Sequence, residues 1–254
     1  MLNTVDDVVL VILIVALSLL FMFALNHFWP AAQRSTHNDI IGWQLSILGT
    51  TYAVIIGFML YTVWTNFGLA DVNANAEANS LLNVYHLADG LPDPQRDELK
   101  KTARLYADTV VQQDWPAMAQ AIGAPLKSRE AATSMWQILM SVKTASPNQV
   151  LAEDHALYEL SGLSSYRKMR QTESSSTLPT VLWFVLIIGG ILTIVSSCMF
   201  GATNLWLHGL QVFAFSLLIA LVLAAIADID RPFQGSVHVS DSGFRRAQAN
   251  MNEQ

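Results

Sequence analysis

The chain has 254 residues, of which 52% are hydrophobic and 13% are charged, about half the charged share of an average soluble domain, so the leading class is an integral membrane protein. The net charge of -6 argues against a nucleic-acid partner, because phosphate contacts need a basic surface. A single cysteine, Cys198, excludes an intramolecular disulfide and suggests neither redox nor zinc chemistry.

Four apolar windows, each close to the roughly 20 residues that cross a hydrocarbon core, predict four transmembrane helices. They run over residues 8–24, 41–64, 181–200 and 205–227, and none contains Lys, Arg, Asp or Glu. The first window follows Asp6 and Asp7 rather than a basic patch, and no small-residue cleavage site follows it. We therefore interpret it as a retained helix and not as a signal peptide.

Four spans divide the chain into residues 1–65 with the first two transmembrane helices, a helical region at 66–178, the last two transmembrane helices at 179–228, and a C-terminal tail at 229–254. Both termini and the helical region then lie on one side. That side carries Arg167, Lys168, Arg170, Arg231, Arg245 and Arg246, whereas Arg34 is the only Lys or Arg on the other side. By the positive-inside rule, the large side is cytoplasmic.

Residues 66–88 lack proline and keep apolar residues at helical spacing, so the second span is expected to run on into the cytoplasm as one helix of about 45 residues. Pro92 ends it. Asp93 then offers an N-cap, with Pro94 in the first turn, to a helix whose apolar stripe implies a packing partner. The stripe consists of Leu99, Ala103, Tyr106 and Val110.

Further helices complete the cytoplasmic region. The motif Asp114-Trp115-Pro116 is expected to end one helix and begin a short one, which Gly123 and Pro125 then break. Ser128 is expected to cap the next, which carries Trp136, Leu139 and Met140, and Ser146-Pro147 opens a last one through Leu157, Leu160 and Leu163. The fold class is therefore an all-α integral membrane protein with four transmembrane helices and a helical cytoplasmic region between spans two and three.

Catalytic and metal-binding patterns give no support for an enzyme. The sequence contains no P-loop, no dinucleotide-binding glycine motif, no nucleophile elbow and no H-E-x-x-H. Its six histidines are scattered and no pair has the spacing of metal ligands. We expect no cofactor and no bound metal.

The second span has an unusual composition, with a row of small residues at near-helical spacing and several hydroxyls and amides around it. Such residues let helices approach closely and tend to face other helices or water rather than lipid. Two interpretations stay open: ordinary close packing in a four-helix bundle, or a helix that lines a pore. The pore-lining candidates are Gly49, Ala53, Ile56, Gly57, Leu60, Trp64, Asp71 and Glu77.

In the pore interpretation, the bulky Ile56, Leu60 and Trp64 would form an apolar constriction that gates by dewetting. Further along the helix, Asp71 and Glu77 would present acidic rings at the cytoplasmic mouth. The alternative for these two acids is that they are ordinary solvated helix charges.

Five stretches give the chain a family resemblance. They are AVIIGFMLYTVW in the second span, AEANSLLNVYHLADGLPDP after it, then RLYADTVVQQDWPAM, LPTVLWFVLIIGGILTI and DIDRPFQGSVHVS. In this order and spacing, they resemble the bestrophin-like family of bacterial membrane proteins, distantly related to bestrophins. The chain departs from the family pattern at Asp114, where glutamate usually precedes the tryptophan, and at Asp241-Ser242-Gly243, which replaces a proline-containing continuation.

The resemblance implies a homopentameric ion channel in a bacterial inner membrane, with four membrane helices per subunit, inorganic ions as cargo and a pore lined by the second helix with an apolar neck. Eukaryotic bestrophins also bind calcium in an acidic run after the last span. Here Arg231-Pro232-Phe233-Gln234-Gly235 is followed by SVHVS, which lacks the six to eight oxygen ligands that Ca²⁺ takes, so we expect no calcium site.

The same stretch is expected to form a structural corner where the fourth span ends. Its residues are Asp228, Asp230, Arg231, Pro232, Phe233 and Gly235. Acids after the last helical turn oppose the negative end of the helix dipole, so a basic partner, Arg231 or an arginine before span three, is expected to stabilise them. Pro232 stops the helix and Gly235 permits the turn that pins the tail to the cytoplasmic helices.

Three functions remain open from the sequence. The favoured one is a homo-oligomeric ion channel. Its alternative is a non-conducting membrane scaffold or signalling subunit that recruits a partner through its cytoplasmic helices. A membrane-embedded transporter or enzyme is less favoured, because no Asp, Glu, Lys or Arg lies within a span to mark a proton or substrate path.

Overall fold

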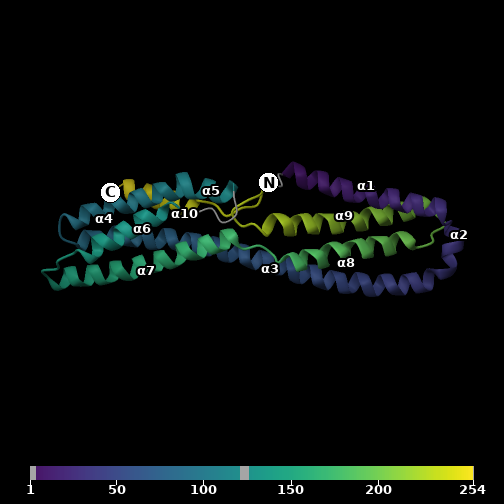
Figure 1. Ribbon diagram of the computed structural model, residues 1–254, viewed down its shortest axis with the longest axis horizontal. Helices are drawn as coiled ribbons and strands as arrows, with labels where there is room; N and C mark the ends of the chain where they lie inside the picture. Colours follow the sequence, from purple (N-terminus) through teal and green to yellow (C-terminus); the bar gives the residue numbers. More distant parts are fainter. Residues whose placement is uncertain (1–3, 121–125, 254) are drawn as a thin grey trace. The chain divides into compact units, whose positions relative to one another are not determined.

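The computed structural model describes residues 4–120 and 126–253, and within them it contains helices and connecting turns but no strand (Figure 1). The chain divides into two compact units. The membrane unit comprises Met1–Thr65 and Thr177–Asp230, and the polar unit comprises Asn66–Ser176 and Arg231–Gln254. One helix, α3 (Asn38–Leu87), is continuous and contributes residues to both.

The membrane unit contains α1 (Thr4–Phe28), the short α2 (Ala31–Arg34) and η1 (Ser35–His37), the first part of α3, α8 (Thr180–Met199) and α9 (Leu205–Ile229). Four of these helices, α1, α3, α8 and α9, are long and apolar enough to cross a membrane. They correspond to the four predicted windows. Helix α1 packs along α9 and α8, and α8 packs on α9 (Figure 1).

Two apolar clusters hold the membrane unit together. Met22, Cys198 and Val212 join α1, α8 and α9. Val63, Leu178, Leu186 and Ile226 join α3, α8 and α9. Many large hydrophobic side chains of these helices point outward and stay exposed, which is the arrangement expected where the surrounding solvent is lipid.

The two short connections of the membrane unit bind one another. Asn38 accepts the N–H of Gly201 at 2.8 Å and donates to its carbonyl at 2.9 Å. Arg34 is buried and donates to the carbonyl of Cys198 and to the side chain of Asn26, both at 2.7 Å. The loop after α1 is therefore fixed to the turn between α8 and α9.

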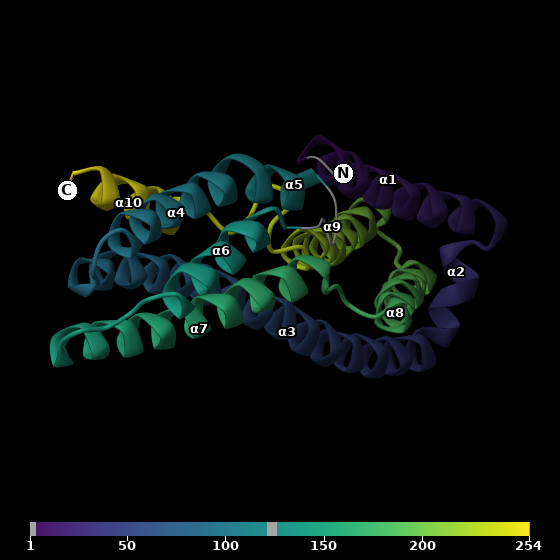
Figure 2. The same ribbon diagram turned by 60° about the vertical axis from the view of Figure 1, so that its left-hand side comes forward.

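The polar unit is a separate helical bundle. It contains the end of α3, η2 (Ala88–Gly90), α4 (Gln95–Thr109), the π-helical turn η3 (Val110–Asp114), α5 (Trp115–Gln120), α6 (Ser128–Met140), α7 (Pro147–Ser175) and α10 (Ser242–Asn252). Helix α4 lies between α6 and α10, and α6 packs on α7 (Figure 2). The predicted stripe of Leu99, Ala103, Tyr106 and Val110 is confirmed as a buried face.

Several predicted boundaries in the polar unit can be compared with the structure. Ser146 caps α7 by accepting the N–H of Gln149, as its position before Pro147 predicts. The Asp93 cap of α4 is wrong: Pro94 occupies the N-cap position, and Asp93 instead pairs with Arg96 at 2.7 Å. Gly123 and Pro125 lie outside the described residues.

The helix that begins at the Asp114 motif continues the previous one through a π-helical turn, rather than starting after a break. Ser128 is the first residue of α6, and Lys127 takes the cap position.

The C-terminal segment belongs to the polar unit and is not a free tail. Its helix, α10, was not predicted. Phe244, Ala247 and Met251 are buried against the rest of the bundle, and Arg104 and Tyr85 both donate to the carbonyl of Met251. These bonds satisfy one of the carbonyls that a helix end leaves without an intrahelical partner.

Candidate pore helix and buried charge cluster

The membrane part of α3 packs on its own chain through a narrow seam. Its fully buried residues are Ile41, Tyr52 and Val63, which recur every eleven residues and so return to one face after three turns. Tyr52 donates to the carbonyl of Leu186 at 2.8 Å, and a Cβ at Gly189 would lie 2.6 Å from the Tyr52 ring. Glycine on α8 thus lets the tyrosine of α3 dock closely.

Ala53 and Gly57, two of the small residues predicted to line a pore, lie away from this seam, whereas Gly49 is half-buried beside α8 and α9. A Cβ added at Gly49 or Gly57 would meet no atom within 4 Å, and Ala53 and Gly57 are exposed. Trp64 is 60% exposed. This face of α3 is therefore uncovered in the single chain.

The three residues predicted to form a constriction differ in burial in the single chain. Ile56 and Leu60 are half-buried and pack against the cluster around Val63 and Leu186, whereas Trp64 lies on the exposed surface. Helical periodicity places these three residues close to one stripe. Ile56 and Leu60 nevertheless contact α8 and α9 and are partly buried in the core of their own chain.

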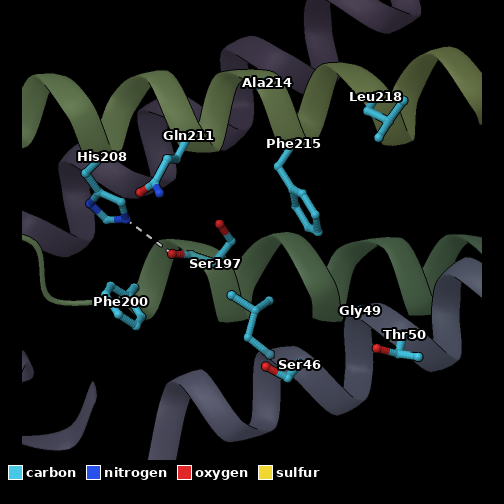
Figure 3. A pocket seen from close by; sticks show the side chains of 11 residues that line it. Ser46, Gly49, Thr50, Ser197, Phe200, His208, Gln211, Ala214, Phe215 and Leu218 are labelled. Atoms are coloured by element: carbon cyan, nitrogen blue, oxygen red, sulfur yellow. Dashed lines mark hydrogen bonds between the residues drawn. The ribbon is translucent and has the colours of Figure 1, made fainter. Parts of the chain in front are cut away.

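A cavity of about 670 Å³ lies beside Gly49, between α3, α8 and α9 (Figure 3). Its polar lining comes from all three helices: Ser46 and Thr50, Ser197, and His208 with Gln211. His208 is buried, and its Nε2 lies 3.2 Å from the carbonyl oxygen of Ser197. Polar side chains converging inside the membrane-spanning part of a protein are typical of a wet or protein-contacting surface rather than a lipid-facing one.

Glu77, predicted to face a pore mouth, is instead completely buried in the polar unit, and that expectation is wrong for the single chain. Arg170 of α7 donates two hydrogen bonds to its carboxylate, from Nε to Oε2 at 2.7 Å and from Nη2 to Oε1 at 2.8 Å. Tyr106 donates to Oε1 at 2.5 Å. A buried carboxylate requires such partners, because its desolvation is otherwise prohibitive. Asp71 is half-buried.

Asp114 joins the same cluster from the end of η3. Its Oδ2 lies 3.5 Å from Nη2 of Arg170, and its Oδ1 accepts the N–H of Lys127 at 2.6 Å. That N–H precedes α6, so the carboxylate also sits at the positive end of a helix dipole. The Asp114 carboxylate thus links η3 with α7 and with the start of α6.

The cluster shifts the pKa values of Tyr106 and Arg170. Burial, and then the neighbouring Glu77 carboxylate, raise the pKa of the Tyr106 phenol well above its ordinary value, so the ring stays a neutral donor. Burial alone would lower the pKa of Arg170, but the Glu77 carboxylate outweighs it and raises the pKa above the ordinary value. The guanidinium is therefore permanently charged.

Sequence reasoning missed Arg170, Tyr106 and Asp114 as one cluster. Tyr106 lies on the predicted buried stripe. A buried tyrosine hydroxyl usually has a hydrogen-bond partner, so its presence on the stripe is the one sequence signal of a polar group inside the bundle. The pairing of Glu77 with Arg170 spans 93 residues and has no local signature.

The corner after α9 is built from two parts. In the membrane unit, both carboxylate oxygens of Asp230 accept the N–H of Leu178, at 2.9 and 3.1 Å. The backbone N–H of Leu178 is thus one partner of Asp230, and the basic partner expected for these acids stays a prediction. Asp228 and Arg231 are half-buried.

In the polar unit, Pro232 accepts the N–H of Val239 at 2.7 Å, and buried Phe233 meets the Trp115 ring edge-on with centroids 5.6 Å apart. Gly235 adopts a φ of 81°, which favours glycine, so the turn predicted there has a backbone reason.

Among the described residues, no group of three or more His, Cys, Asp or Glu side chains could hold a metal ion.

Comparisons with known proteins agree with the family resemblance. A family model described as Bestrophin-like domain matches residues 12–244, which is most of the chain. Neither the curated proteins nor the solved structures yield a match. The chain therefore belongs to the Bestrophin-like family.

Proposed function

We propose that the protein is a subunit of a homo-oligomeric ion channel, a pentamer in a bacterial inner membrane with both termini in the cytoplasm. Inorganic ions are the cargo, and the chain performs no catalysis. The family as a whole relates to ion channels, and four apolar helices provide the membrane anchor. The pore is formed by α3 helices, one from each copy.

The observation that carries this proposal is the uncovered small-residue face of α3. The membrane part of α3 buries only Ile41, Tyr52 and Val63 against its own chain, with Ile56 and Leu60 half-buried beside them, and leaves much of its remaining surface for lipid, water or another copy. Gly49, Ala53 and Gly57 are poor lipid-facing residues but good helix-contact or pore residues, because they allow close approach. Copies of α3 around an axis would use that face.

Two further features support the same function. The cavity beside Gly49 brings several polar side chains together within the membrane unit, among them Thr50 and Gln211, next to an apolar lining that includes Phe215. At the other end of α3, the bond network around Glu77 and Arg170 fixes the helix in the polar unit. A pore helix needs such an anchor, since its rotation would change which residues face the axis.

The test is to reconstitute the purified protein in a planar bilayer under asymmetric KCl and to record current, with Trp64→Ala and Leu60→Ala in parallel. We expect discrete currents with a defined reversal potential. Trp64→Ala should change conductance more than Leu60→Ala does, because Trp64 is exposed and Leu60 packs partly on its own chain.

Silence from well-assembled protein, in the wild type and both variants, would refute the channel. The result would favour the scaffold alternative. One surface feature favours that role: Leu151 and Tyr158 of α7 are exposed and lie seven residues apart, on one face of the helix.

A further inference from the structure

We propose that the groove between α1, α8 and α9 binds one acyl chain of a membrane phospholipid. The groove has a volume of about 460 Å³ and lies wholly within the membrane unit. Helix α1 contributes Leu10, Leu17 and Phe21, α8 contributes Trp183 and Ile187, and α9 contributes Leu223. This surface is separate from the polar cavity beside α3.

The length and position of the groove correspond to one leaflet. From Leu10 to Phe21, a helix rises about 17 Å, roughly half of the 30 Å hydrocarbon core. The groove starts near the beginning of α8, at Trp183, and reaches the last turn of α9, at Ala227. These ends of the spans are the ones through which the chain continues into the polar unit. Tryptophan at such a depth is typical of the membrane interface.

The chemistry of the lining excludes most other occupants. Its one hydroxyl, on Ser18, already donates to the carbonyl of Ile14 at 2.7 Å, so this hydroxyl does not donate to a polar ligand. Membrane helices associate through small and polar residues, and only three of the fourteen lining residues, Ser18, Gly190 and Ala227, are of that kind. The groove walls are instead large and branched, with exposed Leu17, Ile187 and Ile191. A flexible hydrocarbon chain fills such an irregular apolar surface without directional bonds.

A matched pair of substitutions on α1 tests the proposal. Leu17 lines the groove and is 56% exposed, whereas Leu13, on the same helix and 51% exposed, does not line it. The full-length protein is purified in detergent, and phospholipid per chain is measured by native mass spectrometry. We expect Leu17→Trp, which fills the groove, to lose retained phospholipid several-fold, while Leu13→Trp retains as much as the wild type.

A second measurement uses protein reconstituted in bilayers. Phospholipids brominated on the acyl chain quench tryptophan on contact, and the contribution of Trp183 is the difference between the wild type and Trp183→Phe. We expect this contribution to be strongly quenched. A shielded Trp183, or equal lipid retention by the Leu17 and Leu13 variants, would overturn the proposal. Loss of oligomer size in Leu17→Trp with unchanged lipid would assign the groove to a second copy instead.

Discussion

Replacement of Arg170 by methionine should destabilise the polar unit far more than the loss of an arginine from a surface ion pair. Arg170, Glu77 and Asp114 each have fully buried side chains, and the guanidinium lies within 2.7 to 3.5 Å of both carboxylates. Removing one partner of a buried pair costs about 3–5 kcal/mol, because it leaves a buried charge uncompensated. Here two carboxylates lose their cation, so we expect the upper part of that range and a Tm lower by about 10 °C or more.

The assay is thermal unfolding in detergent, followed by tryptophan fluorescence. Trp115 is a local reporter, since the Arg170 guanidinium carbon lies 5.5 Å from its ring centroid. The matched control is Arg245→Ala, which removes a solvent-exposed arginine from its pair with Asp241 and should leave Tm unchanged.

A double variant separates charge from packing. Glu77→Leu combined with Arg170→Met removes both charges of the bidentate pair, so its loss of stability should be smaller than the sum of the two single losses. A stabilising role for the charge cluster would be refuted if Arg170→Met unfolded at the wild-type temperature, or if the double variant lost as much as the two singles added together.

Three further predictions concern other contacts. Gly201→Ala should prevent normal assembly, measured by gel filtration, because the added Cβ would clash with the backbone N of Ser35. The atoms nearest to this Cβ all belong to the backbone, so no side chain can move aside to make room. Asp230→Ala should lower the free energy of unfolding by about 1–3 kcal/mol, because the buried N–H of Leu178 loses its acceptor; unchanged stability and assembly would contradict the corner. Burial raises the pKa of Glu173 in the folded state above its ordinary 4.5. Between the unfolded-state pKa and the raised folded-state pKa, the folded state binds more protons than the unfolded state, so the free energy of unfolding should fall as the pH rises through this range. In Glu173→Gln, the pH dependence of Tm should lose this component.

Several helices were predictable from a local signal. Proline and serine at 146–147 mark a helix start that the structure reproduces, and the stripe at Leu99 and Tyr106 marks a buried face. The continuation of the second span into a helix of 50 residues was also readable, because no proline or glycine cluster interrupts it. Helix α10 was missed although Phe244, Ala247 and Met251 have helical spacing, since the segment is short and strongly polar elsewhere.

The candidate site was less predictable than the fold. Which small residues of α3 stay uncovered depends on where Tyr52 docks on α8, and its hydrogen bond to Leu186 joins residues 134 positions apart. For the same reason, the sequence could not tell a pore-facing Glu77 from a buried one. Helical periodicity orders residues around an axis, but the tertiary partner decides which side is inside.

The most direct test of a pore on α3 is block of current by a charged thiol reagent in cysteine variants. Gly57→Cys places a thiol on the uncovered face, and Val63→Cys places one on the seam that is 1% exposed. Both are made with Cys198→Ser, which removes the native thiol. We predict that the reagent blocks the current of Gly57→Cys and leaves that of Val63→Cys unchanged. Block at Val63→Cys with none at Gly57→Cys would contradict a pore on the uncovered face of α3.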